Sequence, residues 1–423
     1  MKLHTRLLIA LVAGAALGFA LHGQAGAGWL AWLSLNILGP IGQLFLRAIF
    51  MIVVPMVFSA LVIGVYELGK GHDLKGVAGR TLLFTILLST ASVTLGIVMT
   101  NMIRPGDRID RSVVPAQSVE ALQANVAAIK PLRQTIVELV PRNPLDSAVR
   151  ALDGEMLALM VFALAFGMAV SAAALANRGD SGTNVLITFL EQVFDACMRI
   201  VHFVMKFAPI AVFAIIFNTT LTFGTSVFVA LALYVITVVG ALLIHQFVVY
   251  SAFLWGMAGR SPMEFFRQAR EVYLYAFSTA SSNATLPLSL EVAETKLKLP
   301  PDIARFTLTV GSTANQNGSA LFEGVTVLFL AQVYGIDLTA GDQVRVMLMS
   351  IVAGIGTAGV PGGSLPMVMI VAQSVGIPAE GMGLILGVDR FLDMCRSAVN
   401  VSGDLVIAAL VSGRPREGAA ELA

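Results

Sequence analysis

The sequence predicts an all-α membrane protein with eight transmembrane helices and two re-entrant helical hairpins. Three observations support this fold class. Hydrophobic residues make up 57% of the 423 residues and charged residues only 13%, whereas soluble proteins carry about 25% charged residues. Apolar stretches long enough to cross a bilayer recur along the chain. Two further apolar stretches are interrupted by loop-forming residues.

The predicted spanning helices follow the apolar stretches in chain order. A spanning helix needs about 20 predominantly apolar residues. The continuous stretches of this length are 5–23, 37–66, 76–102, 186–218, 225–257, 301–333 and 379–412. Residues 121–176 are also apolar, but Pro131, Pro141, Pro144 and Gly154 interrupt them, which predicts a broken helix.

The links between these stretches predict the orientation of the chain. The link from Gly23 to Leu35 has no charged residue and contains Trp29 and Trp32, which is typical of an interfacial turn on the outer side.

Lysine and arginine residues gather instead at 70–80, 260–270 and 414–416. The positive-inside rule then predicts a multi-pass protein of the inner (plasma) membrane with both termini in the cytoplasm. The link at 103–115 carries three arginines and would face outward, as an exception to the rule.

Two segments fit re-entrant hairpins better than simple spans. Residues 263–295, the first hairpin, consist of an apolar part, the polar run 278–285 and another short apolar part. Residues 341–376, the second hairpin, repeat this plan around the glycine-rich run 354–364. Each half is too short to cross a bilayer, and non-helical backbone at membrane depth survives only where it lines a protected cavity. The alternative is a pair of kinked spanning helices.

The last apolar stretch carries five polar residues on one helical face. Asp389, Asp393, Arg396, Asn400 and Asp404 follow at spacings of four, three, four and four, which places them within roughly 80° of the helix circumference. An ionisable group at bilayer depth costs about 2.5–3.5 kcal/mol, so such residues usually line a site or a pathway. The stripe therefore predicts a protein that moves a charged solute through a membrane.

Two members of this stripe suggest the chemistry of the solute. The guanidinium of Arg396 presents a planar fork of donors suited to a carboxylate. Asp393, one turn away, is suited to accept hydrogen bonds from an ammonium group. Together they predict a ligand that has both a remote carboxylate and an amine. The alternative is an internal Asp–Arg pair that neutralises itself.

A polar break within the span 301–333 suggests a cation site. Residues 311–319 contain adjacent Asn and Gly, which favour an unwound turn that frees carbonyl oxygens. Carbonyl, Asn and Asp oxygens are ligands that a small alkali cation prefers. Asn400 and Asp404, one turn apart, would complete the site. The alternative is a packed polar kink.

Composition excludes several other classes. The formal net charge of +1, without clusters of Lys and Arg, gives no footprint for nucleic acid. Cys197 and Cys395 form neither a disulfide framework nor a metal-ligand spacing.

His245 lies in an apolar helix, where a packed and hydrogen-bonded ring is expected. The chain shows no HExxH motif and no Ser/His/Asp constellation. We therefore expect neither an enzyme nor a cofactor beyond coupling ions.

Four motifs resemble one family. They are SSNATLP at 281–287, NQNGSALFEG at 315–324, GTAGVPGG at 356–363 and DRFLDMCRSAVNVSGD at 389–404. All four are similar to the dicarboxylate/amino acid:cation symporters, which include archaeal aspartate transporters and mammalian excitatory amino-acid transporters. Further similarity at 55–64, 93–99 and 207–216 extends the resemblance over nearly the whole chain.

The resemblance implies a homotrimer that works as an elevator-type transporter. The scaffold domain would comprise 1–75 and 103–218. The transport domain would comprise 76–102 and 219–416, followed by a C-terminal tail at 417–423. The second hairpin would gate the site.

The resemblance also implies roles for individual residues. Arg396 would bind the side-chain carboxylate of the substrate and Asp393 its ammonium group. The other substrate-binding positions would be Ser282, Ser319, Val360, Ser397 and Asn400. One sodium site would comprise Gly311, Asn315, Asn400 and Asp404. A second would comprise Thr313, Gly354, Ile355 and Thr357.

The chain departs from the family pattern at cation-coupling positions. The family sequence Asn-Met-Asp-Gly-Thr reads Asn-Gln-Asn-Gly-Ser at 315–319, so Asn317 replaces a carboxylate of a third sodium site. The partner positions of that site would be Thr85, Leu88 and Ser89, and this predicts that the third site does not bind sodium.

Glu323 stands where mammalian members carry a glutamate implicated in proton coupling, which makes it the predicted proton carrier. The alternative is a glutamate facing a polar crevice. Ala280 and Cys395 also depart from the family pattern, so the coupling stoichiometry does not follow from the resemblance.

The predicted function is symport of an acidic amino acid, glutamate or aspartate, with Na⁺ and/or H⁺. The alternative within the same family is C4-dicarboxylate symport of succinate, fumarate or malate, where a serine stands in place of Asp393. A buried guanidinium without an anionic ligand is costly, so Arg396 disfavours a neutral substrate. An ion channel without an organic solute is a third candidate, against which the two hairpins argue.

Overall fold

The computed structural model describes residues 3–69, 75–109, 137, 140–151, 156–176, 185–224, 226–357, 359, 362–377 and 381–413. Every regular element within these ranges is helical, as the composition predicts. Val360 and the tail at 417–423, both named by the sequence prediction, lie outside them.

The N-terminal third contains single helices at the predicted stretches 5–23 and 76–102, but the predicted stretch 37–66 is divided by a turn at Met51 and Ile52. Its elements are α1 (Leu3–Leu21), α2 (Gly28–Leu33), a π-helical turn (Ser34–Leu38), α3 (Gly39–Phe50), α4 (Val53–Gly69) and α5 (Lys75–Ile103). The prediction of a turn over Gly23–Leu35 is wrong for its second half, because Trp29 and Trp32 lie in α2 with more than half of each side chain exposed. The apolar pattern of this segment outweighs its glycine content.

The middle third contains the described part of the broken helix predicted at 121–176 and a further break. Its elements are α8 (Pro144–Val149), α9 (Met156–Ala176), α10 (Val185–Met205), α11 (Ala208–Phe223) and α12 (Ser226–Ile244). The first two of these belong to the broken helix, and residues 121–136, 138–139 and 152–155 of that prediction lie outside the described ranges. The predicted stretch 186–218 is divided at 206–207 because Pro209 has no N–H with which to continue α10.

A π-helical turn (His245–Val249) continues α12. His245 is fully buried there and meets the Tyr250 ring edge-on at a centroid distance of 4.5 Å. Neither ring nitrogen has a hydrogen-bond partner among the described residues. The expectation of a packed ring is therefore confirmed, but that of a hydrogen-bonded ring is wrong.

The C-terminal third shows the predicted helix–break–helix segments. The helices of the first hairpin are α14 (Pro262–Gln268), α15 (Arg270–Thr279) and α16 (Ser282–Thr295), followed by α17 (Pro301–Ala314) and α18 (Asn317–Tyr334). The second hairpin contains α19 (Ala340–Gly356) and α20 (Leu365–Gln373), and α21 (Met382–Ser412) closes the described chain.

The first hairpin turns more tightly than its polar run predicts. Only Ala280 and Ser281 separate α15 from α16. Ala280 adopts a left-handed conformation with φ of 50°, and the Ser281 hydroxyl accepts a hydrogen bond from the Ala284 N–H at 3.2 Å. This N-cap starts α16 early, so Asn283 and Thr285 are helical.

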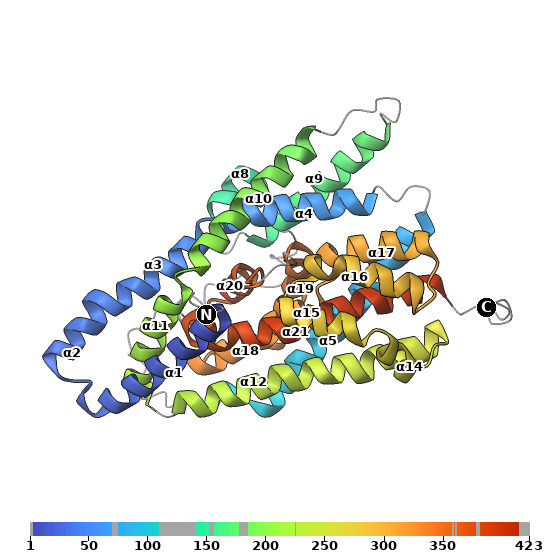
Figure 1. The fold of residues 1–423 in the computed structure, drawn as a ribbon. Helices are drawn as coiled ribbons and strands as arrows, with labels where there is room; N and C mark the ends of the chain where they lie inside the picture. The colour runs from blue at the N-terminus through green and yellow to red at the C-terminus, as the bar shows by residue number, and fades with distance from the viewer. Residues whose placement is uncertain are drawn as a thin grey trace.

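The helices pack as two groups. In the first, α1 and α3 pack against α11, while α9 and α10 pack against α4. In the second, α5, α12 and α15–α20 gather around α18 and α21. Figure 1 shows α4, α9 and α10 on one side of the molecule and α12 along the opposite side.

Close contacts join the two groups along α21. A Cβ atom on Gly383 would collide with the side chain of Ile215 on α11, and one on Gly387 with Leu11 on α1. These two glycines let α21 approach α1 and α11 more closely than any other residue would allow.

Three helical runs within the described ranges have the length and composition to cross a membrane: Gly76–Arg108, Val227–Ala258 and Met382–Ser412. Four shorter apolar helices accompany them, at Ile9–Gln24, Val54–Tyr66, Ala158–Ala174 and Ala208–Thr222. The total of eight spans remains a prediction. The run ending at Ser412 differs from the other two. Of its most apolar 18 residues, 83% are buried, compared with 44% in each of the other runs. α21 is therefore the central helix, and its polar stripe faces protein.

Candidate functional site

The polar stripe predicted on the last span lies inside the helix packing. Asp389, Asp393, Arg396, Asn400 and Asp404 all belong to α21, and each is at most 5% exposed. Neighbouring side chains reach this stripe from α18, from the break between α17 and α18, and from the second hairpin.

The guanidinium of Arg396 lies between two carboxylates. Its Nη1 donates a hydrogen bond to Asp389 Oδ1 at 2.9 Å, and its Nη2 lies 2.9 Å from Asp393 Oδ1. The second pair is close but not aligned, so Nη2 and Nε make no hydrogen bond with the described residues. The guanidinium also lies over the Phe322 ring, 4.2 Å from its centroid. The internal Asp–Arg pair foreseen as an alternative is thus present, with donors left for an anionic ligand.

Asp393 joins α21 to the second hairpin. Its Oδ2 accepts a hydrogen bond from the Gly362 N–H at 3.0 Å and a longer one from Arg390 Nη1 at 3.3 Å. The carboxylate therefore has two cationic neighbours and one backbone donor. Any ammonium group that binds here must share or displace one of these contacts.

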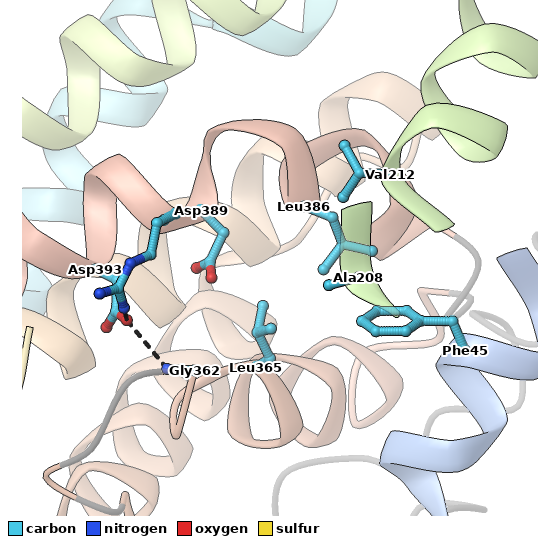
Figure 2. A pocket seen from close by; sticks show the side chains of 9 residues that line it. Phe45, Ala208, Val212, Gly362, Leu365, Leu386, Asp389 and Asp393 are labelled. Atoms are coloured by element: carbon cyan, nitrogen blue, oxygen red, sulfur yellow. Dashed lines mark hydrogen bonds and ion pairs between the residues drawn. The ribbon is translucent and has the colours of Figure 1, made fainter. Parts of the chain in front are cut away.

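A small pocket adjoins this charged cluster. Figure 2 shows Asp389 and Asp393 near Gly362 and Leu365, with Phe45, Ala208 and Val212 opposite them. Leu386 and Arg390 complete the lining. The pocket therefore lies where α3 and α11 of the first helix group meet α20 and α21 of the second.

Asn400 organises the start of α18. Its Oδ1 accepts hydrogen bonds from the N–H groups of Gly318 and Ser319 at 2.7 and 3.2 Å. Its Nδ2 donates to Gln316 Oε1 at 2.5 Å and to Ser319 Oγ at 3.1 Å. The structure thus brings Asn400 and Ser319 together, as expected of residues of one site.

Two further residues predicted to bind substrate, Ser282 and Ser397, are buried on α16 and α21. Ser282 begins α16, and its buried hydroxyl has no hydrogen-bond partner among the described residues. Ser397 is buried on α21 directly after Arg396. Ser282 therefore offers a hydroxyl that a ligand can engage.

The break between α17 and α18 brings together the first predicted cation site. The backbone leaves the helical region at Asn315 and Gln316. Asn315 Nδ2 donates to Asp404 Oδ1 at 2.7 Å, while the buried Asn315 Oδ1 has no hydrogen-bond partner among the described residues. A Cβ atom on Gly311 would lie 2.5 Å from Asp404 Oδ1, so only glycine permits this approach.

The charge at this site favours a cation. Asp404 is buried, and no salt bridge within the described ranges includes it. A buried carboxylate without a cationic partner is costly, and oxygen atoms of Asp and Asn are suitable ligands for sodium. Gly311, Asn315 and Asp404 therefore lie together with a negative charge and oxygen atoms that suit a small cation. The side-chain oxygen of Asn400, the fourth predicted residue, instead accepts from the N–H groups of Gly318 and Ser319.

The second predicted cation site is less complete. Gly354 and Ile355 lie in the last turn of α19, Thr357 follows it, and Thr313 lies in α17, which packs against α19. The Thr357 hydroxyl already donates to the Ala353 carbonyl oxygen at 2.9 Å and to Glu323 Oε1 at 3.1 Å. The lone pairs of the Thr357 oxygen stay available to a cation, while the side chain of Thr313 lies outside the described part of the protein.

Glu323 is fully buried on α18. Its Oε2 has no hydrogen-bond partner in the part of the chain that the structure describes, and no salt bridge there includes it. Protonation would remove the cost of burying this unpaired charge. The contact with Thr357 links Glu323 to the second hairpin.

Asn317 lies in an uncharged network. Its Oδ1 accepts from Ser89 Oγ at 2.6 Å, and its Nδ2 donates to the Tyr250 hydroxyl at 3.2 Å. The Tyr250 hydroxyl in turn donates to the Val399 carbonyl oxygen at 3.1 Å. Thr85 and Leu88, the other predicted partners, are buried on α5. The amide of Asn317 is thus satisfied without a cation.

Several residues of this region were not predicted from the sequence. Gln316 holds Asn400, Tyr250 holds Asn317, and Arg390 contacts Asp393. Only Arg390 had a signal in the sequence, because it precedes Asp393 by three residues and therefore lies on the same helix face. The other two contacts join distant segments.

Comparisons with known proteins agree with the geometry. Residues 3–414 match the model of the sodium:dicarboxylate symporter family. The chain is 33% identical to a proton/glutamate-aspartate symporter of Escherichia coli, over 96% of this chain and 91% of that protein. It is 35% identical to a proton/sodium-glutamate symport protein of Bacillus subtilis, over 97% and 92%. It is 30% identical to the excitatory amino acid transporter 3 of Oryctolagus cuniculus, over 86% and 76%.

Proposed function

We propose, from the premise that this chain belongs to the sodium:dicarboxylate symporter family, that it imports aspartate or glutamate by secondary active symport with Na⁺ and/or H⁺. The relatives named as glutamate or glutamate-aspartate symporters cover nearly the whole chain. The observation that carries the proposal is the buried contact between Arg396 and Asp393, 2.9 Å apart beside the second hairpin.

The substrate binds to both members of this charged pair and replaces part of the contact between them. Its side-chain carboxylate takes the free donors of Arg396, and its ammonium group takes the oxygens of Asp393. Ser282, Ser319 and Asn400 supply the hydroxyl and amide groups for the α-carboxylate. Sodium binds at Gly311, Asn315 and Asp404, and Glu323 carries a proton.

Movement follows the elevator scheme. The second helix group, with the substrate and ions enclosed, slides against the first, and the second hairpin opens and closes the site. The hydrogen bond from the Gly362 N–H to Asp393 supports this gating role. A ligand that binds the Asp393 carboxylate would compete with this bond and so change how the second hairpin is held. The assembly is a homotrimer in the inner membrane with both termini in the cytoplasm.

Transport into proteoliposomes tests the proposal. Radiolabelled aspartate, glutamate and succinate are offered while inward sodium and proton gradients are imposed separately. Accumulation of aspartate or glutamate above the external concentration, driven by either gradient, is expected. Accumulation of succinate alone would instead establish the C4-dicarboxylate function. Movement only down the solute gradient would establish a channel.

A further inference from the structure

Arg390 is a second positively charged side chain beside the buried cluster of Asp389, Asp393 and Arg396. Its Nη1 lies 3.3 Å from Asp393 Oδ2, the oxygen that also accepts from the Gly362 N–H. Its side chain is 18% exposed, whereas that of Arg396 is 1% exposed. Its buried Nε has no hydrogen-bond partner among the described residues, and the side chain lines the pocket that Phe45 and Val212 also line.

The two arginines are held differently. Arg396 contacts both Asp389 and Asp393, whereas the one ion pair recorded for Arg390 within the described ranges is with Asp393. The formal charges of Asp389, Arg390, Asp393 and Arg396 cancel. Arg390 is therefore the member of this cluster that can leave Asp393 while Arg396 remains held by Asp389.

This arrangement bears on ligands that differ only by an amine. Aspartate and succinate share a four-carbon skeleton with a carboxylate at each end, and only aspartate carries an ammonium group. An ammonium group that binds Asp393 Oδ2 competes there with Arg390. Succinate meets no such competition, and it benefits when Arg390 compensates the charge of Asp393.

We infer that Arg390 is a specificity-determining residue. It competes with the ligand's ammonium group for Asp393 and so makes the protein's preference for acidic amino acids over dicarboxylates smaller than it would be without this arginine. Neutralising Arg390 makes the site more negative, which favours the ammonium group and repels a ligand that carries only carboxylates. The inference rests on the proposed function, since it concerns the substrates of the same site.

Competition between the two ligands tests this inference. Aspartate uptake by Arg390→Gln and by the unmodified protein is measured in proteoliposomes with increasing succinate. The ratio of the succinate inhibition constant to the aspartate KM is expected to rise about tenfold in Arg390→Gln, as the loss of one charge-assisted contact predicts. Arg390→Lys keeps the charge, so its ratio is expected to stay within about threefold of the unmodified value.

Controls separate the possible failures. Arg305→Gln removes an exposed arginine paired with Glu294 and is expected to leave the ratio unchanged. If the unmodified protein takes up no acidic amino acid, the proposed function fails. If it does, and the ratio in Arg390→Gln is unchanged or falls, the inference alone is overturned.

Folding is checked by size-exclusion chromatography and thermal melting, with Arg390→Met and Arg390→Ala as further neutral variants. Neutral variants that fold must all shift the ratio in the same direction. If none of the three folds while Arg390→Lys does, Arg390 has a structural role and the inference is also overturned.

Discussion

The Asn317 amide donates a hydrogen bond of 3.2 Å to the Tyr250 hydroxyl, which joins the start of α18 to α13 (Tyr250–Phe253), the short helix after the π-helical turn at His245–Val249. Together with Ser89, this contact satisfies both ends of the amide. Asn317, which the resemblance predicts to replace a family carboxylate, therefore belongs to a complete hydrogen-bond network, and the local structure does not require a third cation. Fewer than three sodium ions should accompany each substrate, and a measured ratio of three would contradict this interpretation of Asn317.

Restoring the carboxylate should make stability depend on sodium. In Asn317→Asp, a buried charge without a cationic partner is expected to cost about 3–5 kcal/mol. The melting temperature without sodium should fall, and sodium should raise it more than in the unmodified protein, because a ligand that binds only the folded state stabilises it. Asn317→Ser serves as an uncharged control. An equal response of all three proteins to sodium would exclude a latent cation site here.

Loss of the charge on Asp404 should weaken sodium binding. Asp404→Asn keeps a side-chain oxygen near Asn315 but removes the carboxylate charge, so the sodium concentration for half-maximal uptake should rise at least about tenfold. The sodium dependence of aspartate uptake measures this shift. Asp302→Asn, at the exposed start of α17, is the matched control and should behave like the unmodified protein. Unchanged sodium dependence in Asp404→Asn would remove this residue from the cation site.

Asp393→Ser should abolish uptake of aspartate and glutamate. The serine hydroxyl cannot neutralise the substrate's ammonium group, and Arg396 loses one of its two carboxylate neighbours. Uptake of both labelled amino acids into proteoliposomes provides the measurement. Asp337→Ser, at a side chain that is 94% exposed, provides the control. Full uptake by Asp393→Ser would show that the ammonium group binds elsewhere.

Glu323→Gln should uncouple transport from the proton gradient. Glutamine retains an oxygen for the Thr357 hydroxyl but cannot gain or lose a proton at physiological pH. An inward proton gradient at fixed sodium should therefore stimulate uptake in the unmodified protein and in the control Glu294→Gln, whose side chain is 26% exposed and paired with Arg305, but not in Glu323→Gln. Equal stimulation in all three would assign proton coupling to another group.

Local sequence patterns predicted much of the fold and of the site. The spacing along 389–404 placed five polar residues on one helix face, and all five are buried in α21. The adjacent Asn and Gly residues at 311–319 predicted an unwound turn; the helix is interrupted at Asn315 and Gln316, directly before that pair, which itself begins α18. Both predictions depend on neighbours along the chain, whose effect on backbone geometry is direct.

Contacts between distant segments could not be predicted in the same way. The Ser281 hydroxyl and the Asn283 N–H both donate to the Gly359 carbonyl oxygen, at 2.8 and 3.1 Å, and so join the two hairpins. No pattern within either hairpin specifies this pairing, because it depends on how α16 and α19 pack around α17. The π-helical turn at His245 was missed because its apolar residues also fit a regular helix.

The two glycines of α21 that meet Leu11 and Ile215 set a limit on how the helix groups can be altered. A methyl group at either position would act as a wedge between α21 and its neighbours α1 and α11. Because α21 contacts both neighbours at these two glycines, even alanine at Gly383 or Gly387 would disrupt the packing between the two helix groups while leaving every charged residue in place.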